Sequence, residues 1–210
     1  MKKLILFQGD SITDARRDRE SETGWGFDMG SGYAILIAGR LQKDHLDDGL
    51  ICENRGISGN RVVDLYARWK IDALNLKPDL LSILIGVNDT WHEIGNHNGV
   101  EVPRYAQFLR MLMQWTQAEL PQTKIVLMEP FVLVTGSVEE SWLAEMDARR
   151  QVVKEVAAEF GTIFLPLQDM FNDAAKLAPA NYWLNDGVHP TAAGHKLISD
   201  AWLKATSSIR

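Results

Sequence analysis

The chain has 210 residues, of which 46% are hydrophobic and 24% are charged, and its formal net charge is −6. These proportions are typical of a globular protein with a sizeable core, and we expect one domain over residues 1–210. The acidic balance argues against the basic surface that nucleic acid or an anionic membrane attracts, so we expect neither as a partner. The one cysteine, Cys52, excludes an intramolecular disulfide and lies in an apolar run typical of a buried thiol.

Residues 4–7 are predicted as the first strand. The apolar run there is shorter than a secretory signal needs, and no stretch of the sequence reaches membrane-spanning length, so a cytoplasmic location is the default expectation. Gly9, Asp10 and Ser11 follow the strand directly. A serine there can be presented as a reactive group at a helix N-terminus, but it can equally be an ordinary helix cap, and this motif alone does not decide between the two.

The next elements in chain order are a helix over residues 33–46 and a strand over residues 50–53. The glycine-rich segment 24–30 before them misses the dinucleotide-binding fingerprint by one position and does not directly follow a strand. The loop after the second strand contains Gly56 and Gly59. Two glycines so close together indicate unusual backbone angles or the close approach of a ligand.

A helix over residues 62–74 and a third strand over residues 80–85 come next, and Asn88 lies in the loop GVND that follows. Farther on, His92 and His97 resemble a zinc-binding helix motif. They are five residues apart rather than four, and the glycine and asparagine between them disfavour a helix, so we predict no metal site.

The second half of the chain continues with helices over residues 104–119 and 141–160 and strands over residues 124–128 and 162–165. In the segment 141–160 the apolar residues fall on one stripe, and Arg149 falls off it, on the predicted polar face.

The last helix is predicted over residues 192–205, and the segment NDGVHP leads into it. The three-residue offset between Asp186 and His189 can place the carboxylate against the imidazole ring on a single turn. Strands that alternate with helices along the whole chain predict a parallel sheet covered on both faces, a three-layer α/β/α fold. Sites in such folds gather at the carboxyl ends of the strands, where all of these polar segments fall.

Taken together and in order, FQGDSIT, GISGN, GVND and DGVHP resemble the four sequence blocks of the SGNH (GDSL-type) hydrolases. The resemblance implies a flavodoxin-like fold with a five-stranded parallel sheet, and a serine hydrolase that needs no cofactor. It implies Ser11 as nucleophile, His189 as general base and Asp186 as the group that orients the imidazole. The oxyanion hole would consist of the Ser11 N–H, the Gly59 N–H and the side-chain amide of Asn88.

Three longer segments, TGWGFDMGSGYAILIAGRLQ, NRGISGNRVVDLYARW and IGVNDTW, look like the bacterial acetylxylan or xylo-oligosaccharide esterases of that group. This closer resemblance implies hydrolysis of short-chain, acetyl esters of a carbohydrate and a homo-oligomeric assembly. The chain departs from some of these esterases at Asn185, where they carry an aromatic residue that would contact the sugar.

The chain is rich in tryptophan, with seven residues, and Trp25, Trp91 and Trp183 are expected in loops at the active face. From the residues alone, these side chains can stack on a sugar ring or wall an apolar pocket. The resemblance to carbohydrate esterases favours the first role.

Two alternatives remain open from the sequence. A lysophospholipase or thioesterase for long acyl chains would use the same catalytic residues with a different acyl pocket. A non-catalytic domain that binds a sugar or a protein partner would keep the fold without the chemistry.

Overall fold

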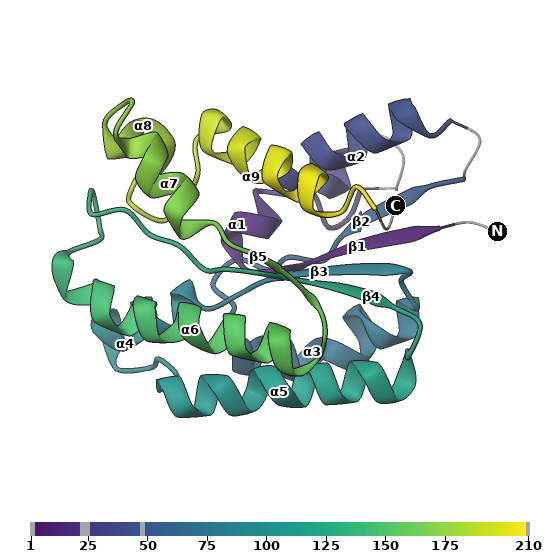
Figure 1. Ribbon diagram of the computed structural model, residues 1–210, viewed down its shortest axis with the longest axis horizontal. Coiled ribbons are helices and arrows are strands. Elements are labelled where there is room, and N and C mark those ends of the chain that lie inside the picture. Colours follow the sequence, from purple (N-terminus) through teal and green to yellow (C-terminus); the bar gives the residue numbers. More distant parts are fainter. Residues whose placement is uncertain (1–2, 22–25, 47–48, 209–210) are drawn as a thin grey trace.

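The computed structural model describes residues 3–21, 26–46 and 49–208. Its centre is one parallel sheet with the strand order β2-β1-β3-β4-β5 (Figure 1). The strands are β1 (Leu4–Gly9), β2 (Ile51–Asn54), β3 (Leu80–Leu84), β4 (Lys124–Met128) and β5 (Ile163–Leu165). They agree with the five predicted strands to within one or two residues at each end.

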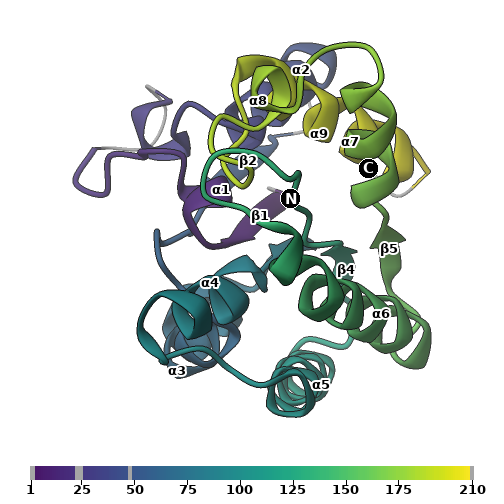
Figure 2. The same cartoon turned by 90° about the vertical axis from the view of Figure 1, so that its left-hand side faces the viewer.

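Helices cover both faces of this sheet, as Figures 1 and 2 show. On one side lie α1 (Ser11–Asp14), α2 (Tyr33–Asp44), α7 (Gln168–Ala175), α8 (Ala180–Trp183) and α9 (Ala192–Ala205). On the other side lie α3 (Val62–Asp72), α4 (Val87–Asn96), α5 (Val102–Glu119) and α6 (Leu143–Glu159). The predicted three-layer α/β/α fold is confirmed.

The order of the strands around β1 determines where the functional loops meet. From β1 the chain crosses to β2 on one side and then returns to β3 on the other, so β1 and β3 are neighbours from which the chain departs in opposite directions. Gly9 at the end of β1 pairs in register with Leu84 at the end of β3. In open α/β sheets, ligands bind in the crevice outside the carboxyl ends of two such strands.

Each face of the sheet packs against its own hydrophobic core. Phe7 points toward α2 and α9, and its ring lies 5.9 Å from that of Tyr33 and 5.7 Å from that of Trp202, centroid to centroid. The next residue back along the strand, Leu6, points the other way, into the core under α3 and α5. This alternation follows from the strand period of two, and it explains why strands buried on both faces have continuous apolar sequences.

The structure corrects the prediction for the segment around His92. Residues 87–96 form the helix α4, although Gly95 and Asn96 were expected to prevent one. Both lie in its last turn, and the chain leaves the helix at His97 in a left-handed conformation (φ 55°). Residues that disfavour a helix interior are compatible with its end, so the helix stops there rather than failing to form.

Arg149 is the second correction, because its side chain is fully buried rather than on the polar face of α6. Its guanidinium donates to the hydroxyl of Thr90 (2.7 Å) and to the carbonyl of Val100 (2.6 Å), and it lies over the ring of Tyr105. Partners from α4 and α5 thus replace water around this charge, which the sequence of α6 alone does not show.

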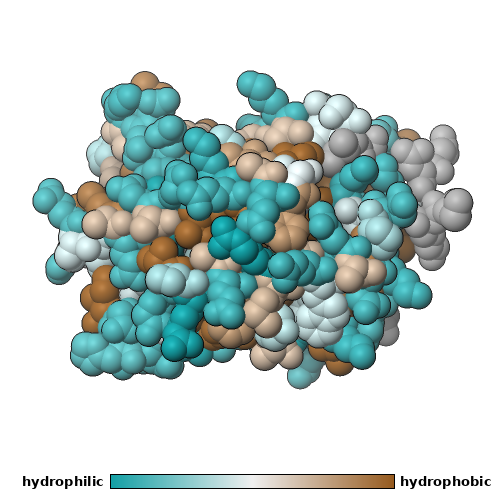
Figure 3. Space-filling view, turned by 60° about the horizontal axis from the view of Figure 1, so that its bottom comes forward, coloured by the Kyte–Doolittle hydropathy of each residue, from teal (hydrophilic) through white to brown (hydrophobic). Residues whose placement is uncertain are grey.

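The outer surface on the side of α3 and α5 is mostly hydrophilic, with hydrophobic side chains scattered over it (Figure 3). Within the described residues, no helix has both the length and the apolar character that crossing a bilayer requires.

Candidate active site

Ser11 is the first residue of α1, and it follows the carboxyl end of β1. The helix is capped by Asp10, whose carboxylate accepts the backbone N–H of Ile12 (3.0 Å), so capping is not the role of Ser11. The first N–H groups of a helix have no acceptor in a preceding turn. The hydroxyl of Ser11 is therefore not used for capping, and a backbone N–H without a helical acceptor lies beside it.

The carboxyl group of Asp10 is completely buried behind this serine. Burial raises its pKa from 3.8 to about 7, because a charged carboxylate loses its hydration there. The hydrogen bond from the Ile12 N–H and the charge of His189 act in the opposite direction.

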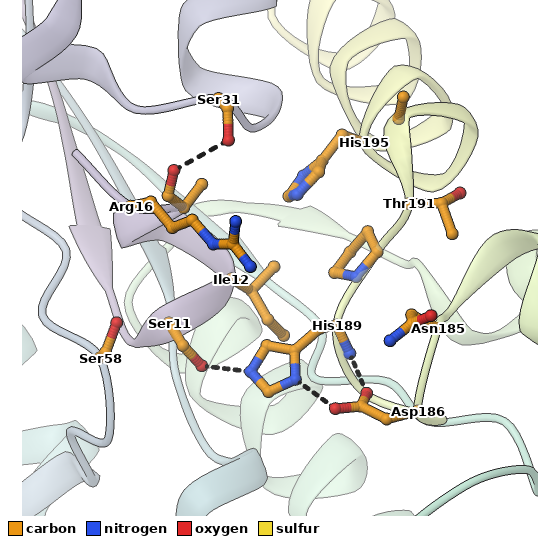
Figure 4. A pocket seen from close by; sticks show the side chains of 13 residues that line it. Ser11, Ile12, Arg16, Ser31, Ser58, Asn185, Asp186, His189, Thr191 and His195 are labelled. Carbon is orange, nitrogen blue, oxygen red and sulfur yellow. Dashed lines mark hydrogen bonds and ion pairs between the residues drawn. The ribbon is translucent and has the colours of Figure 1, made fainter.

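A continuous chain of hydrogen bonds joins Ser11, His189 and Asp186 (Figure 4). The hydroxyl oxygen of Ser11 lies 2.8 Å from Nε2 of His189, and Nδ1 of the same ring lies 2.7 Å from a carboxylate oxygen of Asp186. The serine and the histidine are 178 residues apart in the sequence. The fold thus brings together the three residues that the motifs singled out.

The other oxygen of Asp186 accepts the backbone N–H groups of Val188 (3.0 Å) and His189 (2.8 Å). Partial burial alone would raise the pKa of Asp186, but the hydrogen bonds from His189 and Val188 outweigh it and lower the pKa below the usual value. The carboxylate is therefore ionised at neutral pH, as a group that orients an imidazole must be.

The predicted oxyanion donors Gly59 and Asn88 follow β2 and β3 at the same edge of the sheet. Asn88 is buried at the start of α4, and its amide nitrogen donates to the carbonyl of Asn60 (3.1 Å). An amide nitrogen carries two hydrogens, so this bond fixes the orientation of the group and leaves a second donor for a ligand. Gly59 has φ +82°, a left-handed conformation that glycine adopts without strain, and the space in front of its Cα is open.

Asp14, a residue that the motif analysis did not single out, ties the Ser11 loop to the Gly59 loop. One of its oxygens accepts both the N–H (2.9 Å) and the hydroxyl (3.1 Å) of Ser58, and it also pairs with Arg19 (2.8 Å). Burial would raise the pKa of Asp14, but the hydrogen bonds from Arg19 and Ser58 lower it below its usual value. The ionised carboxylate thus fixes the distance between two loops that carry predicted site residues.

Two of the three tryptophans expected in loops lie in helices instead. Trp91 lies in α4, where its ring centroid is 5.8 Å from that of His189 and 5.4 Å from that of Trp142. Trp183 ends α8 and packs against the core, and Trp25 lies outside the described residues. A sugar contact by Trp91 or Trp183 stays a prediction, since neither is among the described residues that line the cavity at Ser11.

That cavity has a volume of about 820 Å³ and opens beside Ser11 and His189 (Figure 4). Besides the catalytic candidates, it is lined by hydrogen-bonding and apolar side chains. The hydrogen-bonding ones are Arg16, Ser31, Ser58, Asn185, Thr191 and His195, and the apolar ones are Ile12, Ala15, Pro190 and Ala192. Sequence reasoning missed Arg16 and His195. The available signal was their position, directly after the Ser11 turn and in the first turn of the helix that follows His189.

His92 and His97 do not come together with further ligands. His97 faces the carboxylate of Glu93 at 3.8 Å, and both side chains are largely exposed. Across the described ranges, no three His, Cys, Asp or Glu side chains are grouped so that they can hold a metal ion.

Comparisons with known proteins agree with this geometry. The model of the GDSL-like lipase/acylhydrolase family matches residues 7–197. An acetylxylan esterase from Geobacillus stearothermophilus is 39% identical over 207 residues, which are 95% of this chain and 92% of that protein. A second acetylxylan esterase, from Xylanibacter ruminicola, is 26% identical over 91% of this chain and 40% of its own.

Solved structures of similar proteins also belong to GDSL-like lipases and acetylxylan esterases. A protein from Parabacteroides merdae described as a GDSL-like lipase superposes with a TM-score of 0.94 at 45% identity, over 98% of this chain and 95% of that one. The Geobacillus acetylxylan esterase Axe2 superposes with a TM-score of 0.87 at 36% identity, over 97% and 93% of the two chains. By its sequence, its fold and the residues at its active site, the chain belongs to the GDSL-like lipase/acylhydrolase family.

Proposed function

We propose that the protein is a serine esterase that removes acetyl groups from a carbohydrate, such as an acetylated xylo-oligosaccharide. The observation that carries the chemistry is the unbroken hydrogen-bonded chain from Ser11 through His189 to Asp186. Support for this assignment also comes from Axe2, for which catalytic mutants carry alanine in place of a serine, an aspartate and a histidine.

In the first half-reaction, the hydroxyl oxygen of Ser11 attacks the ester carbonyl while Nε2 of His189 accepts its proton. The negative oxygen of the tetrahedral intermediate is held by the N–H groups of Ser11 and Gly59 and by the amide of Asn88. The intermediate collapses when the protonated His189 gives its proton to the leaving sugar oxygen. An acetyl group then remains on Ser11.

In the second half-reaction, His189 removes a proton from water, and the resulting hydroxide attacks the acetyl carbonyl. The proton returns from His189 to the oxygen of Ser11, acetate leaves, and the free enzyme is restored. Asp186 stays ionised throughout and stabilises the positive imidazolium in both halves. The residues of this chain supply every proton transfer in the sequence.

The hydrogen-bonding groups in the cavity support a carbohydrate substrate, because a sugar presents hydroxyls that pair with such groups. Ile12, Ala15, Pro190 and Ala192 line the same cavity and add apolar surface. The lining therefore does not decide the length of the acyl chain, and the alternative of a lysophospholipase or thioesterase is tested by the series of esters described below.

The test compares the wild-type chain, Ser11→Ala and the matched surface variant Ser207→Ala, with chelator present and no metal added. We expect Ser11→Ala to lower kcat on an activated acetyl ester at least about 10³-fold, and Ser207→Ala to leave it unchanged, because the side chain of Ser207 is exposed near the end of the chain. Full activity in Ser11→Ala, or activity lost to the chelator, would overturn the mechanism.

A second measurement addresses the substrate. We expect activity to fall steeply from acetyl to octanoyl esters and to be present on acetylated xylo-oligosaccharides. A rate that rises with acyl length would favour the long-chain alternative instead. A cytoplasmic location and a homo-oligomeric assembly remain predictions from the sequence.

A further inference from the structure

The cavity at Ser11 lies on the side where the leaving group must be. His189 has to protonate the leaving oxygen, so that oxygen sits near its Nε2, and the cavity borders the same ring. An acetyl group is far smaller than 820 Å³, so the cavity serves the alcohol part of the ester.

Arg16 lies on the wall of this cavity and is a cation at neutral pH. It has φ +61°, and Ala15 before it has φ +44°, so two successive residues adopt the left-handed conformation that non-glycine residues rarely adopt. In the described part of the chain, no hydrogen bond or ion pair reaches its guanidinium. Its neighbours differ, since Arg17 donates to the Gly56 carbonyl (2.8 Å) and Arg19 pairs with Asp14.

His195, in α9, supplies a second donor in the lining of this cavity (Figure 4). Its side chain is largely buried, and Nδ1 accepts the backbone N–H of Tyr33 at 3.1 Å. A neutral imidazole that accepts at Nδ1 carries its proton on Nε2, so Nε2 is a donor. Burial and then the charge of His189 lower the pKa of His195 to about 4, which keeps this form dominant at neutral pH.

The backbone beside His195 is shaped to admit the ring. A Cβ on Gly32 would lie 2.9 Å from the ring carbon Cε1 and 2.7 Å from the Cβ of Ala15. The glycine therefore lets the imidazole lie against the turn that carries Arg16. Arg16, in the turn after α1, and His195, in α9, thus reach the cavity from two segments of the same helical layer.

We propose that Arg16 and His195 form a subsite for a carboxylate on the leaving-group part of the substrate, so that the preferred ester is an acetylated oligosaccharide bearing an acidic sugar. Guanidinium pairs with carboxylate through two parallel hydrogen bonds, and the neutral Nε2–H of His195 adds a third donor. The sugar in this inference rests on the proposed deacetylase function. The preference for a carboxylate can be measured with esters that contain no sugar.

The charges around the cavity are compatible with an anion there, even though the chain carries a net charge of −6. Asp186 is the acidic residue in the lining, and its oxygens are already engaged by His189 and Val188. Asp14, behind the wall, is paired with Arg19 and Ser58. Among the described residues that line the cavity, Asp186 is the only carboxylate, and Arg16 contributes a local positive field there.

The experiment uses two matched pairs of esters. The first pair is para-acetoxybenzoate and its methyl ester, which differ in one negative charge on the leaving group. The second is an acetylated xylo-oligosaccharide with and without a uronic acid side group. For each pair we measure the ratio of kcat/KM for the acidic member to that for the neutral member.

We expect the wild-type ratio to exceed that of Arg16→Gln by about tenfold, a modest factor because Arg16 is exposed and water weakens its ion pair with a carboxylate. Arg16→Lys should retain part of the preference. Arg104→Gln removes the same charge from an exposed position on α5 and should keep the wild-type ratio. His195→Phe removes the second donor and should lower the ratio as well.

Equal ratios in wild type and Arg16→Gln would overturn the subsite. Loss of the preference equally in Arg104→Gln would show that net charge, rather than a local site, controls it. If no oligosaccharide is deacetylated but the benzoate pair behaves as expected, the proposed sugar substrate fails while the carboxylate subsite stands.

Discussion

The two sides of Ser11 are built from different kinds of donor. On one side, Gly59 and Asn88 present a backbone N–H and a buried amide that is already held by the Asn60 carbonyl. On the other side, the cavity carries the exposed guanidinium of Arg16 and further hydrogen-bonding groups. Charge develops on the first side during the reaction, so its donors must be fixed beforehand, whereas the second side only has to select an alcohol.

The largest expected effect comes from disrupting the hydrogen-bonded chain of Ser11, His189 and Asp186, which lies between the two sides. In Asp186→Asn, the amide can donate to Nδ1 of His189, which favours the tautomer with its proton on Nε2, facing Ser11. That tautomer cannot accept the serine proton, so we expect kcat to fall about 10⁴-fold, as in other Ser-His-Asp enzymes.

The control for this variant is Asp173→Asn, which changes an exposed carboxylate paired with Lys176. Steady-state kinetics on an aryl acetate would be measured with circular dichroism to verify folding. A folded Asp186→Asn protein within tenfold of wild-type kcat would contradict the assigned role of the aspartate.

Asn88→Ala removes a donor from the fixed side. We expect kcat to fall about 10²- to 10³-fold on every ester, acidic or neutral, because the lost hydrogen bond is made to the developing oxyanion and not to the leaving group. The contrast with Arg16→Gln sharpens the comparison, since that variant changes the ratio between substrates.

Asn75→Ala, at an exposed position after α3, is the matched control and should behave as wild type. If Asn88→Ala changed only KM, or affected acidic esters alone, Asn88 would belong to the selecting side instead.

Local patterns singled out the candidate catalytic residues, and the resemblance to a known family assigned their roles. Asp186 and His189 lie within one turn, and Ser11 and Asn88 each follow a strand, so their approach depends on the parallel sheet alone. The five strands were predictable for a similar reason, because each is a short apolar run covered on both faces.

The residues of the selecting side depend on distant partners, which a sequence pattern does not show. The tautomer of His195 depends on the backbone N–H of Tyr33, 162 residues away. The burial of Arg149 likewise requires Thr90, from a helix that was not predicted. The four-residue helix α8 is too short for a clear helical period, and α4 was not predicted because Gly95 and Asn96 disfavour a helix interior.

The smallest expected effect concerns the pH dependence of stability, and it tests whether His195 is held neutral. The pKa of His195 is lowered from 6.5 to about 4, mainly by burial. Between these two values the unfolded chain binds a proton at this site that the folded chain does not, so the free energy of unfolding falls as the pH drops from 6.5 toward 4. One pKa unit corresponds to about 1.4 kcal/mol, so the loss is roughly 3 kcal/mol at most.

Urea denaturation at pH 6.5 and pH 4 would measure this loss in wild type and in His195→Gln, whose amide can still accept from Tyr33 and donate to the cavity. We expect His195→Gln to lose less stability than wild type over this interval, by up to about 3 kcal/mol. His97→Gln, which removes an imidazole that is 90% exposed, should keep the wild-type loss. Identical losses in wild type and His195→Gln would mean that His195 is protonated as readily in the folded chain as in the unfolded one. The cavity would then carry two cations in mildly acidic solution, and its preference for a carboxylate would increase as the pH falls instead of depending on Arg16 alone.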